Sequence, residues 1–159
     1  DDFDVIYLDA GTTTYAMIPY LEGKRITVVT NGVPHAALLT DLNIETILLG
    51  GKIKQRTKAI IGSVAERQLN EVNFTKAFMG MNGVDITQGF TTPDTEESAV
   101  KRKAILQSSQ SYVLADVSKL DEVSFSKVAD LDECTLITNA LSSEQERYKE
   151  YTRVMEARE

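Results

Sequence analysis

The chain is poor in the residues on which many site chemistries depend: its 159 residues include one cysteine, one histidine and no tryptophan. A disulfide needs two cysteines, so Cys134 has no partner within the chain, which is typical of a reducing compartment. His35 and Cys134 are too few for a His/Cys zinc set, and they make a Ser–His triad a weak candidate, although a carboxylate magnesium site stays open. We expect Cys134 to pack as a small hydrophobic side chain, and His35 to be exposed or to cap a helix.

Basic residues are also in deficit. Lys and Arg number 17 against 24 Asp and Glu, which gives a net charge of −7 and a pI near 4.8. Nucleic-acid affinity depends on counterion release by basic side chains, so the chain alone is not expected to hold nucleic acid. No apolar run approaches the ~18 residues of a membrane span, and no signal-peptide pattern opens the sequence. These absences predict one cytoplasmic domain over residues 1–159, with no membrane partner.

Short apolar runs alternate with longer amphipathic stretches along the chain, which predicts βαβ units. The expected strands lie at residues 5–10, 26–30, 44–49, 76–81, 112–116 and 135–138. The expected helices begin after residue 11, span 34–42, begin near 63, span 95–108 and begin at 143. The predicted fold class is therefore α/β, with an open, mainly parallel sheet and helices on both faces.

Local signals refine this outline. Pro19 is expected to shorten or kink the first helix, because proline cannot donate its backbone hydrogen bond. The last helix is expected to begin at Ser143, with Glu146 completing a capping box. Residues 52–58 read as a solvated basic segment, and residues 85–93 as a long polar loop. Two sets of apolar residues at helical spacing are each expected to share one helix face: Ala65, Leu69 and Val72, and Tyr148, Tyr151 and Met155.

Polar and glycine-rich residues recur where the predicted strands end. They occupy positions 9–14, 30–32, 50–51, 80–83 and 116–119. In open α/β sheets, ligands bind beyond the carboxyl ends of the strands. The recurrence therefore predicts a ligand site along that edge.

Thr12, Thr13 and Thr14 open the first helix directly after Gly11. The unpaired N–H groups of a helix start, together with the helix dipole, favour an anion such as phosphate. One threonine could instead serve only as the N-cap, so a structural role stays open. Lys119, which follows the strand at 112–116, could bring a positive charge to the same anion or lie in a solvated loop.

Residues 94–103 carry acidic and basic side chains in one helix. Asp94 and Glu97 match a capping box, and Glu97 and Lys101 are an i, i+4 pair in the favourable order. Glu97 could instead direct its carboxylate into a cleft and accept hydrogen bonds from a polyol. The run 101–103, Lys-Arg-Lys, is typical of a solvated helix face.

Several motifs, taken in chain order, resemble the effector-binding domain of DeoR-family transcriptional regulators. They are Asp9-Ala-Gly-Thr-Thr-Thr, Thr30-Asn31, Gly50-Gly51, Gly80-Met-Asn-Gly-Val-Asp, Gly89-Phe-Thr-Thr-Pro-Asp-Thr-Glu-Glu with Val100-Lys-Arg, and Leu114-Ala-Asp-Val-Ser-Lys. The resemblance spans residues 5–141. Within the family, the motifs look most like regulators of phosphotransferase sugar operons, such as the fructose and lactose/tagatose repressors.

This resemblance implies a ribose-5-phosphate-isomerase-like (NagB/RpiA/CoA-transferase) fold that senses a phosphorylated sugar and forms homo-oligomers. DNA would be reached only through the winged helix-turn-helix that precedes this domain in family members and is not expected in this chain. No cofactor, metal or catalytic residue is implied. The residues implied to hold the phosphate are Thr12, Thr13, Thr14 and Lys119. Those implied to face the sugar are Asp9, Asn31, Asn82, Asp85 and Glu97, with Lys101 as a second anion contact.

The isomerases of that fold raise an enzymatic alternative. They resemble this chain but carry two aspartates in a Gly-Ala-Asp-Glu-x-Asp segment and a lysine before their catalytic glutamate. Here the segment places Asn82 and Gly83 between Gly80 and Asp85, and the loop from Asp85 to Pro93 contains no lysine. Loss of an acid–base group costs about 10²–10⁴ in rate, whereas asparagine still donates and accepts hydrogen bonds. We therefore favour a sensor over a sugar-phosphate isomerase; a nucleotide- or CoA-binding module lacks a supporting motif.

Overall fold

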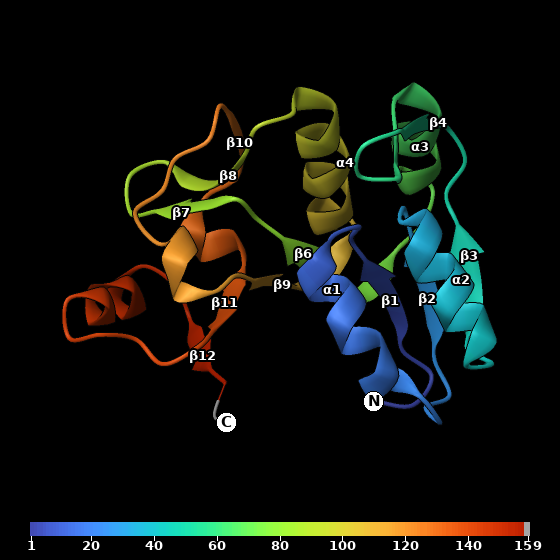
Figure 1. Ribbon diagram of the computed structural model, residues 1–159, viewed down its shortest axis with the longest axis horizontal. Helices are drawn as coiled ribbons and strands as arrows, with labels where there is room; N and C mark the ends of the chain where they lie inside the picture. The colour runs from blue at the N-terminus through green and yellow to red at the C-terminus, as the bar shows by residue number, and fades with distance from the viewer. Residues whose placement is uncertain (158–159) are drawn as a thin grey trace.

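Seven parallel strands form the central sheet of the computed structural model, which describes residues 1–157 (Figure 1). In sheet order they are β12 (Val154–Glu156), β11 (Thr135–Thr138), β9 (Ser108–Leu114), β6 (Phe74–Gly80), β1 (Val5–Leu8), β2 (Thr27–Thr30) and β3 (Glu45–Leu48). Every neighbouring pair in this sheet is parallel, which confirms the predicted open α/β fold. From β1 the chain proceeds to β2 and β3 on one side, then crosses to β6 on the other. Such a switch point leaves a crevice at the carboxyl ends of the strands.

Helices pack on both faces of this sheet, because successive side chains of a strand point to opposite faces. Leu8 and Val28 belong to a core cluster with Leu39 of α2, whereas Tyr7 and Val29 belong to a second cluster with residues of α3 and α4. The α-helices are α1 (Thr12–Met17), α2 (Val33–Asp41), α3 (Ser63–Leu69) and α4 (Thr95–Leu106). The 3₁₀ helices are η1 (Ile18–Leu21), η2 (Val117–Lys119), η3 (Leu131–Glu133) and η4 (Gln145–Glu150). No helix within residues 1–157 combines the length and apolar character needed to cross a bilayer.

Two small antiparallel sheets replace segments expected to be irregular. Residues 85–93 are not a long loop, and residues 52–58 are not a plain solvated segment. The five short strands are β4 (Lys52–Lys54) with β5 (Ala59–Ile61), and β7 (Gly83–Asp85) with β8 (Gly89–Thr92) and β10 (Ser126–Ala129). Gly89 has a φ of 75°, and a Cβ there would lie 2.3 Å from the carbonyl oxygen of Ala129. Only glycine therefore fits this turn.

Helix ends follow some signals and depart from others. Pro19 ends α1 as predicted, and the chain continues as the 3₁₀ helix η1. Val72 lies beyond the end of α3 and is 37% exposed, so it does not join the stripe of Ala65 and Leu69. The expected helix 95–108 ends two residues earlier, because the chain turns directly into β9.

The C-terminal prediction was wrong. Instead of an α-helix from Ser143, the chain forms the 3₁₀ helix η4 and then the edge strand β12, which contains Met155. Tyr148 is fully buried, whereas Tyr151 and Met155 are close to half-exposed, so the three do not share a face. The Tyr148 hydroxyl donates to Asp121 Oδ1 (2.6 Å) and accepts from its backbone N–H (3.0 Å). These hydrogen bonds and β-sheet pairing outweigh the helical pattern.

Candidate functional site

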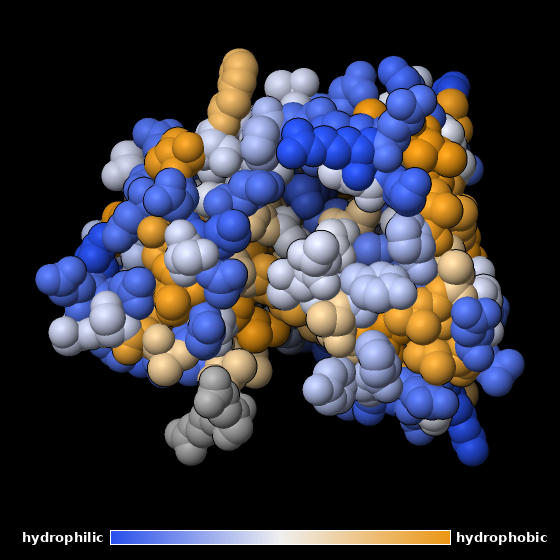
Figure 2. All heavy atoms as spheres, viewed as in Figure 1, coloured by the Kyte–Doolittle hydropathy of each residue, from blue (hydrophilic) through white to orange (hydrophobic). Residues whose placement is uncertain are grey.

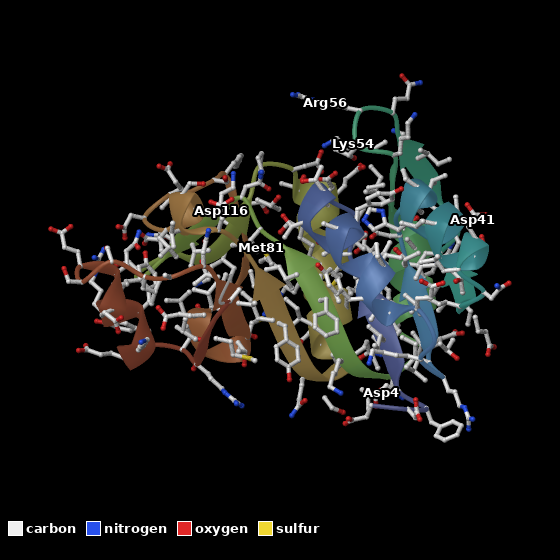
Figure 3. All side chains as sticks on the ribbon, turned by 60° about the horizontal axis from the view of Figure 1, so that its bottom comes forward. Asp4, Asp41, Lys54, Arg56, Met81 and Asp116 are labelled. Atoms are coloured by element: carbon white, nitrogen blue, oxygen red, sulfur yellow. The ribbon has the colours of Figure 1, made fainter. Side chains whose placement is uncertain are left out.

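A cavity of about 470 Å³ opens at the carboxyl ends of β1, β2, β6 and β9, at the predicted edge of the sheet. Figure 2 shows this hollow near the middle of the visible face, rimmed by hydrophilic residues. The charged and hydroxyl- or amide-bearing side chains that line it are Asp9, Thr12, Thr13, Thr14, Asn31, Lys54, Arg56, Thr57, Asn82, Asp94, Glu97, Lys101, Asp116 and Lys119. In Figure 3, Lys54, Arg56 and Asp116 lie at this end of the molecule, far from Asp4 at the opposite end of the strands.

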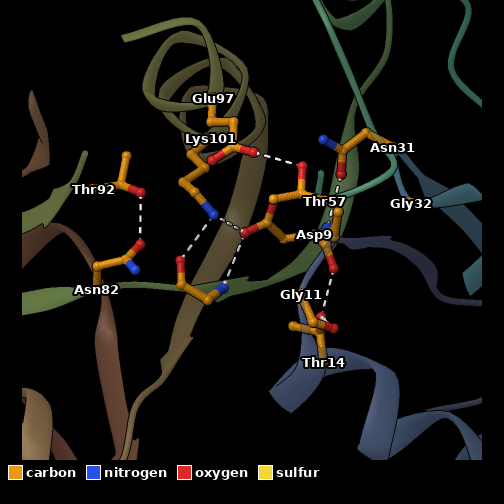
Figure 4. A network of polar contacts seen from close by, with 12 residues as sticks. Asp9, Gly11, Thr14, Asn31, Gly32, Thr57, Asn82, Thr92, Glu97 and Lys101 are labelled. Carbon is orange, nitrogen blue, oxygen red and sulfur yellow. Dashed lines mark hydrogen bonds and ion pairs between the residues drawn. The ribbon is translucent and has the colours of Figure 1, made fainter. Parts of the chain in front are cut away.

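The floor of the cavity is an ion pair between Asp9, just after β1, and Lys101 of α4 (Figure 4). Asp9 Oδ2 also accepts the backbone N–H of Gly80 (3.0 Å), and Lys101 Nζ donates to the Gly80 carbonyl (3.0 Å). Both side chains are buried. Burial raises the pKa of the Asp9 carboxyl, and the Lys101 ammonium opposes that rise. Lys101 is therefore not part of a solvated helix face, and its charge is already paired.

The start of α4 brings acidic side chains to the rim. Asp94 is the N-cap as predicted: its Oδ1 accepts the N–H groups of Glu96 (2.8 Å) and Glu97 (3.0 Å). The Glu97 side chain neither closes a capping box nor pairs with Lys101. It accepts from the Thr57 hydroxyl (3.0 Å) and lies 3.7 Å from Lys54 Nζ, so its carboxylate faces the cavity.

The β4–β5 hairpin contributes cavity residues that sequence reasoning missed. Lys54 Nζ lies 2.6 Å from Asp94 Oδ2, and this hydrogen bond lowers the pKa of Asp94 and raises that of Lys54. Arg56, which also lines the cavity, forms no ion pair with a residue that the structure describes. The available signal was the alternation of polar and apolar residues in Lys52-Ile53-Lys54 directly after Gly51, because a period of two residues is typical of a strand.

Gly11, Thr12, Thr13 and Thr14 form one corner of the cavity, and the three threonines have two different roles there. The N-cap of α1 is Gly11, with a φ of 149°, so none of the three threonines fills the capping role left open by the sequence. Thr12 and Thr13 are exposed and line the cavity. Thr14 is fully buried, and its hydroxyl donates to the Asp9 carbonyl (2.6 Å). Two hydroxyls are thus open to a ligand, whereas the third holds the corner against β1.

His35 is a buried residue, contrary to expectation, and it supports the same corner. Its Nε2 lies 2.8 Å from the Gly11 carbonyl oxygen and 3.2 Å from the Thr14 hydroxyl. Burial lowers the pKa of the imidazole, which favours the neutral ring with its proton on Nε2. His35 is not in contact with the cavity but positions the backbone that forms one wall.

The remaining predicted residues differ in whether their polar side-chain atoms can contact a ligand in the cavity. Asn31 is buried: its Oδ1 accepts from Ala10 N (2.9 Å) and its Nδ2 donates to the Ile60 carbonyl (3.1 Å). Asn82 is exposed, and its Oδ1 accepts from the Thr92 hydroxyl (2.8 Å). Asp85 is not brought to the cavity, because its carboxylate accepts the N–H groups of the β7–β8 turn.

Lys119 ends η2 and lines the cavity beside Asp116. Asp116 caps that helix by accepting the Ser118 N–H (2.8 Å), and its hydrogen bonds with Ser118 lower its pKa. Within residues 1–157, Lys119 forms no ion pair. Lys119 and Arg56 are therefore the two cationic side chains of the cavity left without an ion-pair partner among the described residues.

The described part of the chain holds no cluster of three or more His, Cys, Asp or Glu side chains arranged to hold a metal. Cys134 is buried, which confirms its expected packing as a hydrophobic side chain. Burial raises the pKa of its thiol to about 12, so a thiolate is disfavoured.

Comparisons with solved structures connect this geometry to a known fold. A ribose 5-phosphate isomerase A from Methanocaldococcus jannaschii superposes with a TM-score of 0.53 over 76% of this chain and 48% of its own, at 20% identity. A translation initiation factor eIF-2B from Pyrococcus horikoshii gives 0.53 over 77% of this chain and 43% of its own, at 17% identity. These likenesses confirm the predicted fold.

Sequence comparisons identify the family. An uncharacterized HTH-type transcriptional regulator FruR of Bacillus subtilis is 49% identical over 87% of this chain and 55% of its own length. A lactose phosphotransferase system repressor of Staphylococcus epidermidis is 29% identical over 98% of this chain and 63% of its own. The chain thus spans roughly half to two thirds of these relatives. The model of the DeoR C-terminal sensor domain matches residues 1–140, and the chain accordingly belongs to the DeoR family as a sensor domain.

Proposed function

We propose that the cavity binds a phosphorylated sugar and that binding regulates transcription through a DNA-binding region outside this chain, in the cytoplasm. The observation that carries the proposal is that one cavity is lined both by two cations without an ion-pair partner among the described residues and by two exposed threonine hydroxyls. Lys119 and Arg56 have charge to offer a phosphate, and Thr12 and Thr13, which line the same cavity, offer hydroxyls. Arginine and lysine both bind phosphate oxygens well.

The sugar would occupy the side of the cavity lined by α4. Glu97 and Asn82 both line the cavity with part of their hydrogen-bonding capacity free for ligand hydroxyls, since a carboxylate accepts about four hydrogen bonds. Asp9, Thr14, Asn31 and Lys101 are already bonded within the protein. We assign these four to holding the cavity in shape rather than to direct contact, which narrows the set implied by the family resemblance.

A regulator fits the site better than an isomerase. Proton transfer needs an ionisable group free to exchange a proton with the substrate. The Asp9 carboxylate is committed to Lys101 and Gly80, and Asn82 cannot titrate, so neither supplies a second acid–base group beside the Glu97 carboxylate. The curated relatives described above are named as regulators or repressors, which agrees with this assignment.

The deciding experiment is calorimetric titration of the domain with hexose and pentose monophosphates, each compared with its unphosphorylated parent and with inorganic phosphate. We expect one sugar phosphate to bind, its parent sugar to bind far more weakly, and an isomerase assay on the same samples to show no turnover. At 100 times its dissociation constant, that ligand should stabilise the fold by about 2.7 kcal/mol. Turnover, or equal affinity for sugar and sugar phosphate, would contradict the proposal.

A further inference from the structure

Strand β3 forms one edge of the central sheet and carries side chains that sheet edges of monomeric proteins usually avoid. Ile47 is 52% exposed and Leu48 is 41% exposed. The strand reads Glu-Thr-Ile-Leu, without the lysine, proline or bulge that protects edges from pairing. Ile53 of β4 and Val64 of α3 are exposed as well. Figure 2 shows hydrophobic colour along the right-hand side of the molecule, where Figure 1 places β3, α2 and α3.

The backbone of β3 presents a pattern that another strand would complete. Alternate residues of a strand bond to the same neighbour, and the N–H of Leu49 donates to the Thr30 carbonyl at the end of β2 (3.0 Å). Ile47, two residues earlier, faces β2 in the same way. Thr46 and Leu48 therefore turn their N–H and C=O groups away from β2, toward the open side of the sheet.

We propose that β3 pairs antiparallel with β3 of a second copy of this chain, about a twofold axis through Ile47. In this register Thr46 lies opposite Leu48 of the partner subunit, and both residues have outward backbone groups, as a hydrogen-bonded pair requires. The two copies of Ile47 form the central non-hydrogen-bonded pair, in which side chains are closest. Glu45 falls opposite Leu49 rather than opposite itself, so like charges do not face each other.

Side chains on the α3 face extend this contact. Ile47 is in register with Val29, which belongs to the core cluster that includes residues of α3. Val64 of α3 is therefore on the same face as Ile47. The contact is isologous, because one segment meets its own copy and closes as a dimer rather than growing into a filament.

A second copy fits this edge better than an unrelated partner does. The pairing pattern is complementary to itself, and the chain belongs to a family whose relatives are named as HTH-type regulators. Helix-turn-helix dimers read paired half-sites whose symmetry mirrors that of the protein. The same edge also lies close to the cavity, because β3 runs through Gly50 and Gly51 into the hairpin that carries Lys54.

The test is the oligomeric state of the domain, measured by sedimentation equilibrium up to about 200 μM. Two variants should weaken the pairing of the two β3 strands in different ways. Ile47→Lys places a charge at the centre of the contact. Thr46→Pro removes a backbone N–H that faces away from β2, and an edge strand tolerates proline at such a position. Matched controls are Leu106→Lys, at a 62% exposed site at the end of α4, and Thr46→Val, which keeps the N–H.

We expect a dimer whose dissociation constant rises by at least about 100-fold in both edge variants and stays unchanged in both controls. Circular dichroism and thermal unfolding of each variant separate loss of pairing from loss of folding, and Ile47→Lys decides the matter if Thr46→Pro does not fold. A domain that stays monomeric throughout, or a dimer that Ile47→Lys leaves unchanged, would overturn the proposal. Neither outcome depends on whether a sugar phosphate binds.

Discussion

The ammonium of Lys101 and the carboxylate of Asp9 share Gly80 as a common partner, through its C=O and its N–H respectively. The three groups join the end of β1, the end of β6 and the middle of α4 beneath the cavity. The ion pair therefore holds α4 against the ends of β1 and β6. We expect substitution of either residue to lower the stability of the domain.

Lys101→Met should destabilise the domain by about 3–5 kcal/mol, because it leaves the buried Asp9 carboxylate without its counter-charge. Urea unfolding at neutral pH measures the loss. The double variant with Asp9→Asn should recover part of it, since no buried charge then remains. The control is Lys103→Met, a more exposed lysine of the same helix, which should cost less than about 0.5 kcal/mol. A Lys101→Met domain as stable as this control would contradict the assignment.

Thr12→Ala combined with Thr13→Ala should weaken binding of the sugar phosphate by at least about tenfold, because hydrogen bonds to charged groups contribute about 1.5–3 kcal/mol. Affinity for the unphosphorylated parent should change by less than about twofold. Calorimetry on both ligands checks this, with Thr87→Ala in the β7–β8 turn as the control. Equal losses for the two ligands would remove these hydroxyls from the phosphate site.

Lys119→Gln should reduce affinity for the phosphorylated ligand and also reduce the dependence of that affinity on salt, because the lost attraction between the ammonium and the anion is one that salt screens. Arg56→Gln should act in the same direction. Lys58→Gln is a suitable control, since Lys58 is exposed on the same hairpin but does not line the cavity. Titrations at two ionic strengths measure both effects. If all three variants behave alike, general surface charge rather than these two side chains accounts for binding.

The stability of the domain should fall as pH drops below about 6.5, the pKa of an unperturbed histidine. Burial lowers the pKa of His35 in the folded state, so the unfolded chain binds more protons in that range and is favoured by acid. The difference in unfolding free energy between the natural domain and His35→Gln, followed from pH 8 to 5, isolates this contribution. His35 is the only histidine of the chain, so its imidazole NMR signal reports the pKa directly. A flat difference curve would show that His35 titrates normally.

Gly32→Ala should destabilise the domain by about 1–3 kcal/mol, the usual range for overpacking. A Cβ at Gly32 would lie 2.3 Å from Nδ1 of the His35 ring. The clash should largely vanish in a His35→Ala background, which thermal unfolding of the four proteins in this cycle would detect. Additive losses would mean that the two positions do not interact.

The central sheet was predictable because its signal is local. The runs Val5–Leu8 and Thr27–Thr30 are apolar, β-branched and followed by glycine-containing turns. Short strands such as β8 carry no such pattern: Gly-Phe-Thr-Thr is buried at every position because other segments cover it, not because its residues are apolar. The same reasoning applies to the C-terminal segment, where hydrogen bonds of Tyr148 to distant residues decide the conformation.

The sequence predicted those site residues that directly follow strands of the parallel sheet. Thr12 and Lys119 meet at one cavity because they follow β1 and β9, which are strands of one parallel sheet and end at the same edge. The sequence could not show that Lys101 is buried, because a Lys-Arg-Lys run looks solvated until its helix is oriented. Nor could it show that Lys54 reaches α4, since that contact joins residues forty positions apart.

The buried ion pair at the floor has a consequence for how the domain meets its ligand from a distance. Because the opposite charges of Asp9 and Lys101 cancel there, the floor exerts little net field beyond the cavity, whatever it contributes by hydrogen bonding. Long-range attraction of an anion toward this acidic protein then comes from the rim alone, and such attraction is screened within about 8 Å at physiological ionic strength. Capture should accordingly slow as salt is added, while the rate of escape changes much less.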